Sequence, residues 1–145
     1  MYKRQEQGAK GILHASQIST GEENDLNIRV YGEKAGLAWR QMEPNSLVVT
    51  WLDKPKEILR TGFTSNLYKE AIAHTRVPGG HPEGYMEAFA NIYRNFAICL
   101  RAHLAGTTPD PIYQDFPTVQ DGVRGMQFVN RVVESSATEQ KWLPF

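Results

Sequence analysis

The loop of residues 77–85 concentrates the residue types that could do chemistry. Its sequence, Val-Pro-Gly-Gly-His-Pro-Glu-Gly-Tyr, holds two prolines, three glycines, one histidine and one carboxylate. Glycine lets a backbone approach a ligand closely, and proline stiffens it. His81 and Glu83 could bind hydroxyl groups or move protons. The alternative interpretation is a rigid helix-entry loop in which Glu83 complements the positive N-terminus of the following helix. Residue chemistry alone favours neither.

Motifs that mark catalytic or metal sites are otherwise scarce. The sequence has no glycine-rich phosphate loop, no CxxC or HExxH zinc motif and no GxSxG nucleophile elbow. We therefore expect no metal site. Loop and capping roles explain Asp110, Asp115 and Asp121 about as well as chemistry does. The single cysteine, Cys99, fits a small core residue in a reducing compartment.

Composition restricts the classes of partner. The 145 residues suffice for one domain of ordinary size. The 16 basic and 16 acidic residues balance to zero net charge, which argues against nucleic acid or an anionic membrane as the main partner. No segment approaches the roughly 20 apolar residues of a membrane span. We expect a cytoplasmic protein.

Strands dominate the first half of the chain. Apolar and polar residues alternate with the two-residue period of half-buried strands, and turn-rich segments separate the runs. Short connections favour an antiparallel meander. The predicted strands are residues 11–18, 26–31, 37–42 and 46–52, with a shorter edge strand at 54–60.

The second half changes to a helical period. Residues 86–104 form an amphipathic helix closed by Gly106, and one or two helical turns are expected within 66–74. Thr118 and Asp121 form the start of a last helix as a capping box. Its predicted buried stripe is Val119, Val123, Met126, Val129 or Asn130, and Val133.

These elements predict an α+β fold, a mostly antiparallel open sheet with helices packed on one face. Two helices cover only one face of a sheet. Trp39 and Trp51 suggest that the other face is also partly apolar, and a large open apolar face usually meets a partner. Homodimerisation through this face is the simplest hypothesis.

The segments together resemble a known family. GILHASQISTGEENDLNIRVYGEKAGLAWRQMEPNSLVV looks like the C-terminal domain of the Gfo/Idh/MocA oxidoreductases, the group of glucose–fructose oxidoreductase and inositol dehydrogenase. Further matches are GGHPEGYMEAFANIYRNF, the pairs Asp121-Gly122 and Arg124-Gly125, and Ser135-Ser136 followed by Lys141-Trp142. The resemblance covers residues 8–145.

The resemblance implies an oxidoreductase whose N-terminal Rossmann domain binds NAD or NADP. Members oxidise or reduce carbohydrate hydroxyl and carbonyl groups, and their C-terminal domain closes the substrate pocket and forms dimers. The family's EKP-like lysine motif and its aspartate–histidine pair have no counterpart here, and Lys54-Pro55 is not that motif. We therefore expect no Rossmann domain and no catalytic residue in this chain, inactivity alone, and no tight cofactor binding.

Four residues are predicted to contact a carbohydrate substrate. His81 and Glu83 are the first candidates, and Ser19 and Thr20, in a turn near the expected cleft, are weaker ones. Two alternatives stay open. The chain could be a stand-alone, non-catalytic binding or dimerisation module. It could also belong to an NAD-dependent glycosidase of the same family, which its residues do not distinguish from a sugar or polyol dehydrogenase.

The first residues raise a separate hypothesis. Met-Tyr-Lys-Arg-Gln is the translation of the transposon-end adapter of sequencing libraries when it is started at GTG. We expect residues 1–7 to be a non-native start and residues 8–145 to be an N-terminally truncated C-terminal domain.

Overall fold

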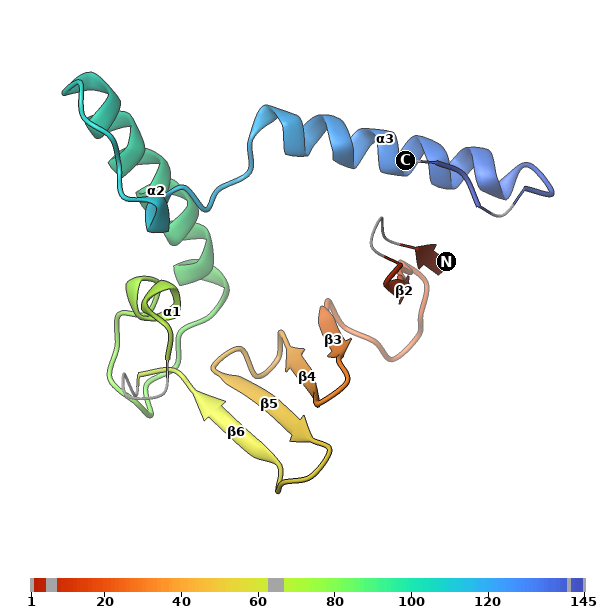
Figure 1. Cartoon of the computed structure of the whole chain (residues 1–145), viewed down its shortest axis with the longest axis horizontal. Coiled ribbons are helices and arrows are strands. Elements are labelled where there is room, and N and C mark those ends of the chain that lie inside the picture. The colour runs from red at the N-terminus through yellow and green to blue at the C-terminus, as the bar shows by residue number, and fades with distance from the viewer. Residues whose placement is uncertain (1, 5–7, 63–66, 141, 145) are drawn as a thin grey trace. The chain divides into compact units, whose positions relative to one another are not determined.

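The chain divides into two compact units, Met1–Ile58 and Leu59–Phe145. The structure, a computed structural model, describes residues 2–4, 8–62, 67–140 and 142–144. Figure 1 shows the strands in the first part of the chain and the helices in the second.

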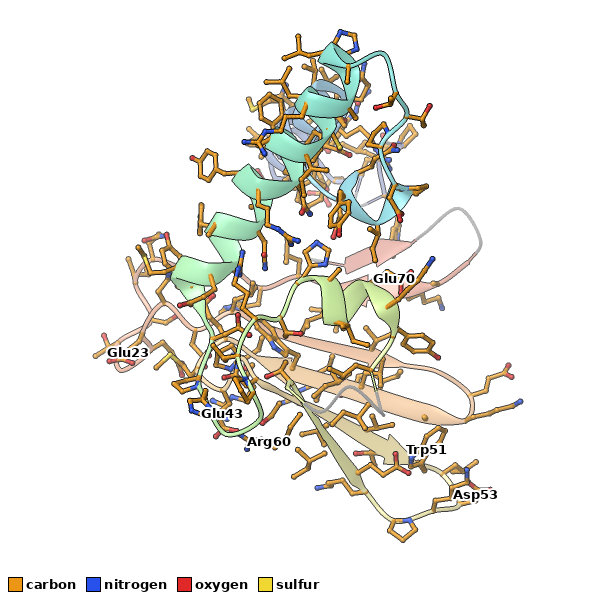
Figure 2. All side chains as sticks on the ribbon, turned by 90° about the vertical axis from the view of Figure 1, so that its left-hand side faces the viewer. Glu23, Glu43, Trp51, Asp53, Arg60 and Glu70 are labelled. Carbon is orange, nitrogen blue, oxygen red and sulfur yellow. The ribbon has the colours of Figure 1, made fainter. Side chains whose placement is uncertain are left out.

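A four-stranded antiparallel sheet forms the larger part of the first unit, and its last strand contains the boundary between the two units. Its strands are β3 (Asn27–Tyr31), β4 (Ala35–Arg40), β5 (Ser46–Trp51) and β6 (Glu57–Arg60). They lie side by side in chain order (Figure 1). The predicted meander is therefore confirmed, and β6 is the edge strand expected within 54–60. Trp51 ends β5, and Asp53 lies in the connection to β6 (Figure 2).

Cross-strand pairs hold the register of this sheet. Val30 faces Leu37 across β3 and β4, and Leu37 faces Val49 across β4 and β5. Val49 is the buried apolar residue at the centre, 5% exposed. The indole N–H of Trp39 donates to the carbonyl oxygen of Pro44 at 3.0 Å, which closes the connection from β4 to β5.

The apolar side chains of β3 stay open to solvent. Ile28 and Val30 alternate with polar residues as predicted, yet they are 55% and 53% exposed. The alternation therefore predicted the strand correctly. It usually also indicates one buried face, but the neighbouring strands do not cover Ile28 and Val30.

The predicted strand at residues 11–18 is much shorter in the structure. Only β2 (Lys10–Ile12) is a strand, and it pairs with β1 (Tyr2–Arg4) in a separate antiparallel ribbon. Ile12, Leu13 and Ile18 are exposed, because no further described strand pairs with this stretch. The predicted start segment 1–7 lies partly outside the described residues, and its origin stays a prediction.

The second unit contains the helices. They are α1 (Lys69–Ala73), α2 (Tyr85–Leu104), the short 3₁₀ helix η2 (Pro111–Tyr113) and α3 (Val119–Ser136). The predicted helix at 86–104 and the turns within 66–74 are thus confirmed. Among these described helices, none is long and apolar enough to cross a membrane.

A capping box starts α3 as predicted. The Thr118 hydroxyl accepts the Asp121 amide at 3.3 Å, and the Asp121 carboxylate accepts the Thr118 amide at 2.8 Å. The Thr118 hydroxyl also donates to the Asp121 carboxylate at 2.7 Å, and this hydrogen bond, together with that from the Thr118 amide, lowers the pKa of Asp121.

The predicted buried stripe of α3 is exposed. Val119, Met126 and Val133 are 79%, 62% and 62% exposed, because no described element of this unit covers that face. Sheet and helices together make the fold α+β, which confirms the predicted class. The packing of helices on one sheet face stays a prediction.

Candidate functional site

His81 lies at the end of a tight turn. The amide of His81 donates to the carbonyl oxygen of Pro78 at 3.2 Å, and its ring atom Nδ1 lies 3.1 Å from the same oxygen. Gly80 takes a φ of 88° at the third position of the turn, a conformation that glycine adopts without strain. The imidazole is exposed.

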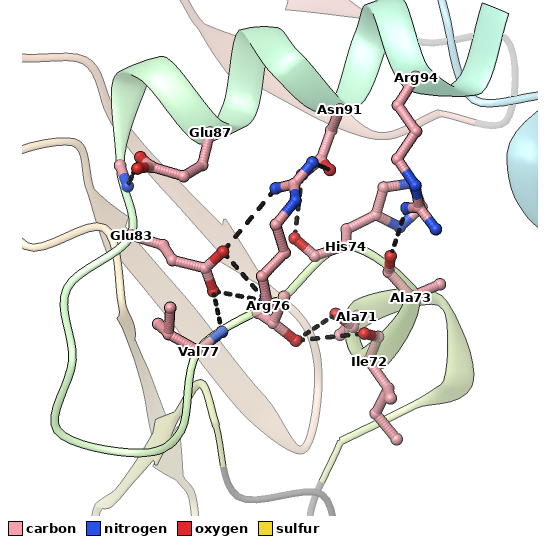
Figure 3. Close-up of polar contacts among 12 residues, drawn as sticks. Ala71, Ile72, Ala73, His74, Arg76, Val77, Glu83, Glu87, Asn91 and Arg94 are labelled. Atoms are coloured by element: carbon pink, nitrogen blue, oxygen red, sulfur yellow. Dashed lines mark hydrogen bonds and ion pairs between the residues drawn. The ribbon is translucent and has the colours of Figure 1, made fainter. Parts of the chain in front are cut away.

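Glu83 follows His81 by two residues and is buried. Its side chain is 8% exposed. The backbone N–H of Arg76 donates to both carboxylate oxygens, at 3.0 and 2.9 Å, and that of Val77 to Oε2 at 3.4 Å. The guanidinium of Arg76 forms an ion pair at 3.8 Å. Figure 3 shows this carboxylate bound to the residues at the start of the loop. Buried charge is tolerated where it is paired and hydrogen-bonded in this way.

Helix α2 fixes the other side of the loop. Arg76 Nη2 donates to Asn91 Oδ1 at 2.6 Å, and Asn91 Nδ2 donates to the His74 carbonyl oxygen at 2.9 Å (Figure 3). Arg94 donates to the Ala73 carbonyl oxygen at 2.9 Å. Asn91 and Arg94 thereby pair the carbonyl oxygens of His74 and Ala73, in the stretch that leads from α1 to the His81 turn.

Asn95 is the most deeply buried polar residue of the described chain, at 1% exposure. Its Nδ2 lies 2.8 Å from His74 Nε2, while His74 Nδ1 lies 2.6 Å from the Glu70 carbonyl oxygen. A carbonyl only accepts, so Nδ1 carries the proton and Nε2 accepts from Asn95. Asn95 Oδ1 has no hydrogen-bond partner within the described residues.

Gly62 packs directly against the turn. A Cβ on Gly62 would lie 2.6 Å from the Gly79 Cα and 2.7 Å from the Pro78 carbonyl carbon. Its φ of 84° is also one that side-chain-bearing residues rarely adopt. The backbone of residues 78–79 therefore approaches so closely that only glycine fits at position 62.

The helix entry completes the site. Gly84 N donates to Glu87 Oε2 at 2.9 Å, and this backbone hydrogen bond is the main reason why the pKa of Glu87 is lowered. Glu87, rather than Glu83, thus caps the N-terminus of α2. Glu83 instead binds the loop that leads into the helix.

The four predicted substrate contacts fall into two groups. His81 and Glu83 belong to one loop of the second unit. Ser19 and Thr20 are exposed in a turn of the first unit, where the Glu22 amide donates to the Ser19 carbonyl oxygen at 3.1 Å. Their contact with a substrate stays a prediction for all four.

Three residues of the site, Gly62, Arg76 and Asn91, were not predicted from the sequence. One signal could have found Asn91: with Asn95 it places two amides four residues apart, on the same face of the helix. No group of three or more metal-binding side chains occurs among the residues that the structure covers.

Comparison with known proteins identifies the class. No family model matches the chain. It is 30% identical over 144 residues to the uncharacterized oxidoreductase YfiI of Bacillus subtilis (strain 168), covering 97% of this chain and 35% of that protein.

Solved structures agree with this class. An oxidoreductase from Sinorhizobium meliloti is 42% identical, with a TM-score of 0.86 over 94% of this chain and 37% of that one. An inositol dehydrogenase homologue from Azotobacter vinelandii, solved with NADH and myo-inositol, is 31% identical, with a TM-score of 0.87 over 99% of this chain and 38% of that one.

Fold and sequence thus define an oxidoreductase-related α+β domain. More particularly, the chain matches the C-terminal part of inositol dehydrogenase homologues, and its predicted resemblance to the Gfo/Idh/MocA-type oxidoreductases is confirmed. It spans little more than a third of the length of these relatives, 35% to 38%.

Proposed function

We propose that this chain is the substrate-binding and dimerisation part of an NAD(P)-dependent oxidoreductase acting on a sugar or polyol. The observation that carries the proposal is the match over 99% of the chain to a protein solved with NADH and myo-inositol. The cofactor, NAD or NADP, belongs to the complete protein. We place that protein in the cytoplasm, where a lone thiol such as Cys99 stays reduced.

His81 is the proposed contact with a substrate hydroxyl. Its ring is exposed at the tip of a turn whose backbone is held by Glu83 and packed against Gly62. A polar side chain on a loop anchored by buried contacts is a typical arrangement for ligand recognition.

Self-association is the second part of the proposal. The apolar side chains of β3, and Leu26 directly before it, lie open to solvent: Leu26, Ile28 and Val30 are each more than half exposed, at 62%, 55% and 53%. An uncovered row of this kind is suited to a second copy of the same sheet.

A chimera tests the function. Residues 8–145 would replace the matching C-terminal part of the Azotobacter vinelandii inositol dehydrogenase homologue, and NADH formation from myo-inositol would be followed by absorbance. We expect turnover by the chimera and none by the 145-residue chain alone. A chimera that binds NADH and oxidises no polyol would refute the proposed function.

The substitution His81→Ala tests the contact within that chimera. Loss of one hydrogen bond to a neutral hydroxyl is expected to raise the KM for myo-inositol by about threefold to tenfold, with the KM for NAD⁺ unchanged. His103→Ala, an exposed histidine in the last turn of α2, is the matched control and should change neither constant. Unchanged kinetics in His81→Ala would remove the proposed contact.

A further inference from the structure

The Pro78 carbonyl oxygen selects one form of the His81 ring. It lies 3.1 Å from Nδ1 and also accepts the His81 amide. Because a carbonyl oxygen only accepts, Nδ1 must carry the proton in this contact. The other ring nitrogen, Nε2, then presents a lone pair on an exposed side chain. It is suited to accept a hydrogen bond from a hydroxyl group.

The position of that carbonyl depends on the residues on either side of it. Arg76 and Val77, directly before Pro78, donate their amides to the Glu83 carboxylate. Glu83 lies two residues after His81, so its carboxylate connects the chain directly after the turn to the chain directly before it. Amide hydrogen bonds to a buried carboxylate are charge-assisted and hold their donors in defined positions.

Helix α2 supplies a second anchor. The Arg76 guanidinium bridges Glu83 and Asn91, at 3.8 and 2.6 Å, and Figure 3 shows it between the two side chains. Rotation of the loop about the Glu83 contact would break the contact with Asn91. The loop is therefore held at two separate points, by Glu83 within the loop and by Asn91 on α2.

Building on the proposed function, we propose that Glu83 is a positioning residue for His81. It holds the turn so that Pro78 keeps the proton on Nδ1, and Nε2 accepts a hydrogen bond from a hydroxyl of a polyol substrate. Arg76 and Asn91 support Glu83 in this role. Glu83 thus acts on the substrate through His81 rather than by direct contact.

The tautomer of His81 tests the positioning role without any substrate. Ring ¹⁵N chemical shifts of the 145-residue chain, at a pH at which the ring is neutral, should show protonation at Nδ1. Glu83→Gln replaces one acceptor oxygen by a donor facing the Arg76 and Val77 amides, and it should convert this signal to a mixture of tautomers. Glu139→Gln, an exposed carboxylate outside the site, is the control. An unchanged tautomer in Glu83→Gln would overturn the proposal.

A second variant covers the case in which Glu83→Gln does not fold. Arg76→Met removes the ion pair with Glu83 and the hydrogen bond to Asn91, yet it keeps the backbone N–H that Glu83 binds. In Arg76→Met the His81 ring signal is expected to move toward a mixture of tautomers, but less than in Glu83→Gln. A folded Arg76→Met chain with the unsubstituted His81 signal would count against the supporting role of Arg76.

Kinetics of the chimera test whether Glu83 acts through His81. Glu83→Gln should raise the KM for myo-inositol by about threefold to tenfold, as His81→Ala does. Once His81 is alanine, Glu83→Gln should have no further effect on this KM. Independent, multiplying effects would show that Glu83 contributes otherwise and would overturn the proposal.

The two proposals fail in different ways. If His81→Ala leaves the KM unchanged, the substrate contact fails and with it the action of Glu83 on the substrate, and the tautomer measurement then decides only whether Glu83 holds the His81 ring. If the chimera is active and His81→Ala raises the KM, but Glu83→Gln changes neither the KM nor the His81 tautomer, the proposed function stands and the positioning role is refuted.

Discussion

Gly62 is the position at which one added methyl group should disturb the candidate site most. In Gly62→Ala the new Cβ would lie 2.6 Å from the Gly79 Cα and 2.7 Å from the Pro78 carbonyl carbon. Both atoms belong to the backbone, so no flexible side chain can move aside. The residue would also keep a φ of 84°, which is unfavourable for alanine.

The expected loss of stability has two parts. The left-handed backbone costs alanine about 1–2 kcal/mol, and overpacking against a fixed backbone adds about 1–3 kcal/mol. Gly80→Ala separates them, because Gly80 has a φ of 88° with nothing within 4 Å of a built Cβ. Gly80→Ala should therefore lose only the stability that the left-handed backbone costs.

Urea unfolding of the chain measures both variants. Far-ultraviolet circular dichroism reports this unit, since the described α-helices all lie in it. We expect the free energy of unfolding of Gly62→Ala to fall below that of Gly80→Ala by about 1–3 kcal/mol, with the denaturant slope unchanged. Equal losses in the two variants would show that the turn does not approach Gly62 closely, and would refute the packing argument.

Two further predictions concern other buried or capped polar groups. Thr118→Ala should cost about 1 kcal/mol through loss of the N-cap, measured by thermal unfolding. The lowered pKa of Asp121 means that its stabilising effect is fully present above its ordinary value of 3.8 and is lost as the pH falls through the lower folded-state value. In Thr118→Ala a carboxyl NMR titration should therefore show Asp121 titrating at higher pH than in the unsubstituted chain, and an unchanged titration would contradict the capping box. Asn95→Ala should lower the free energy of unfolding by about 1–3 kcal/mol, because it leaves His74 Nε2 without its donor. A loss no greater than that of the exposed control Asn130→Ala would show that the pair contributes nothing.

Periodicity predicted the regular elements well because it reports local preference. Thr118 and Asp121 identify the start of α3 through reciprocal hydrogen bonds between residues three apart, and the aromatic and aliphatic residues of α2 repeat every three or four positions. The strand predicted at residues 13–18 is absent, because the loose alternation of these residues does not show which strand would pair with them. The exposed stripe of α3 has the same cause, since an apolar face shows that a helix packs but not what covers it.

The candidate site was only half predictable. The composition of the loop identified His81 and Glu83, but their different roles depend on long-range hydrogen bonds. Sequence spacing does not show that Glu83 binds the amides of Arg76 and Val77. Likewise, Gly62 gains its importance from residues 78–79, which lie far along the chain.

The order of the strands in the sheet has a consequence for how the first unit folds. Each strand from β3 to β6 has its chain neighbour as its sheet neighbour. Every loop that must close is short, so little chain entropy is lost before the pairing contacts form. Such local topologies fold quickly. The sheet can therefore assemble hairpin by hairpin, and no pairing has to wait for a strand from a distant part of the chain.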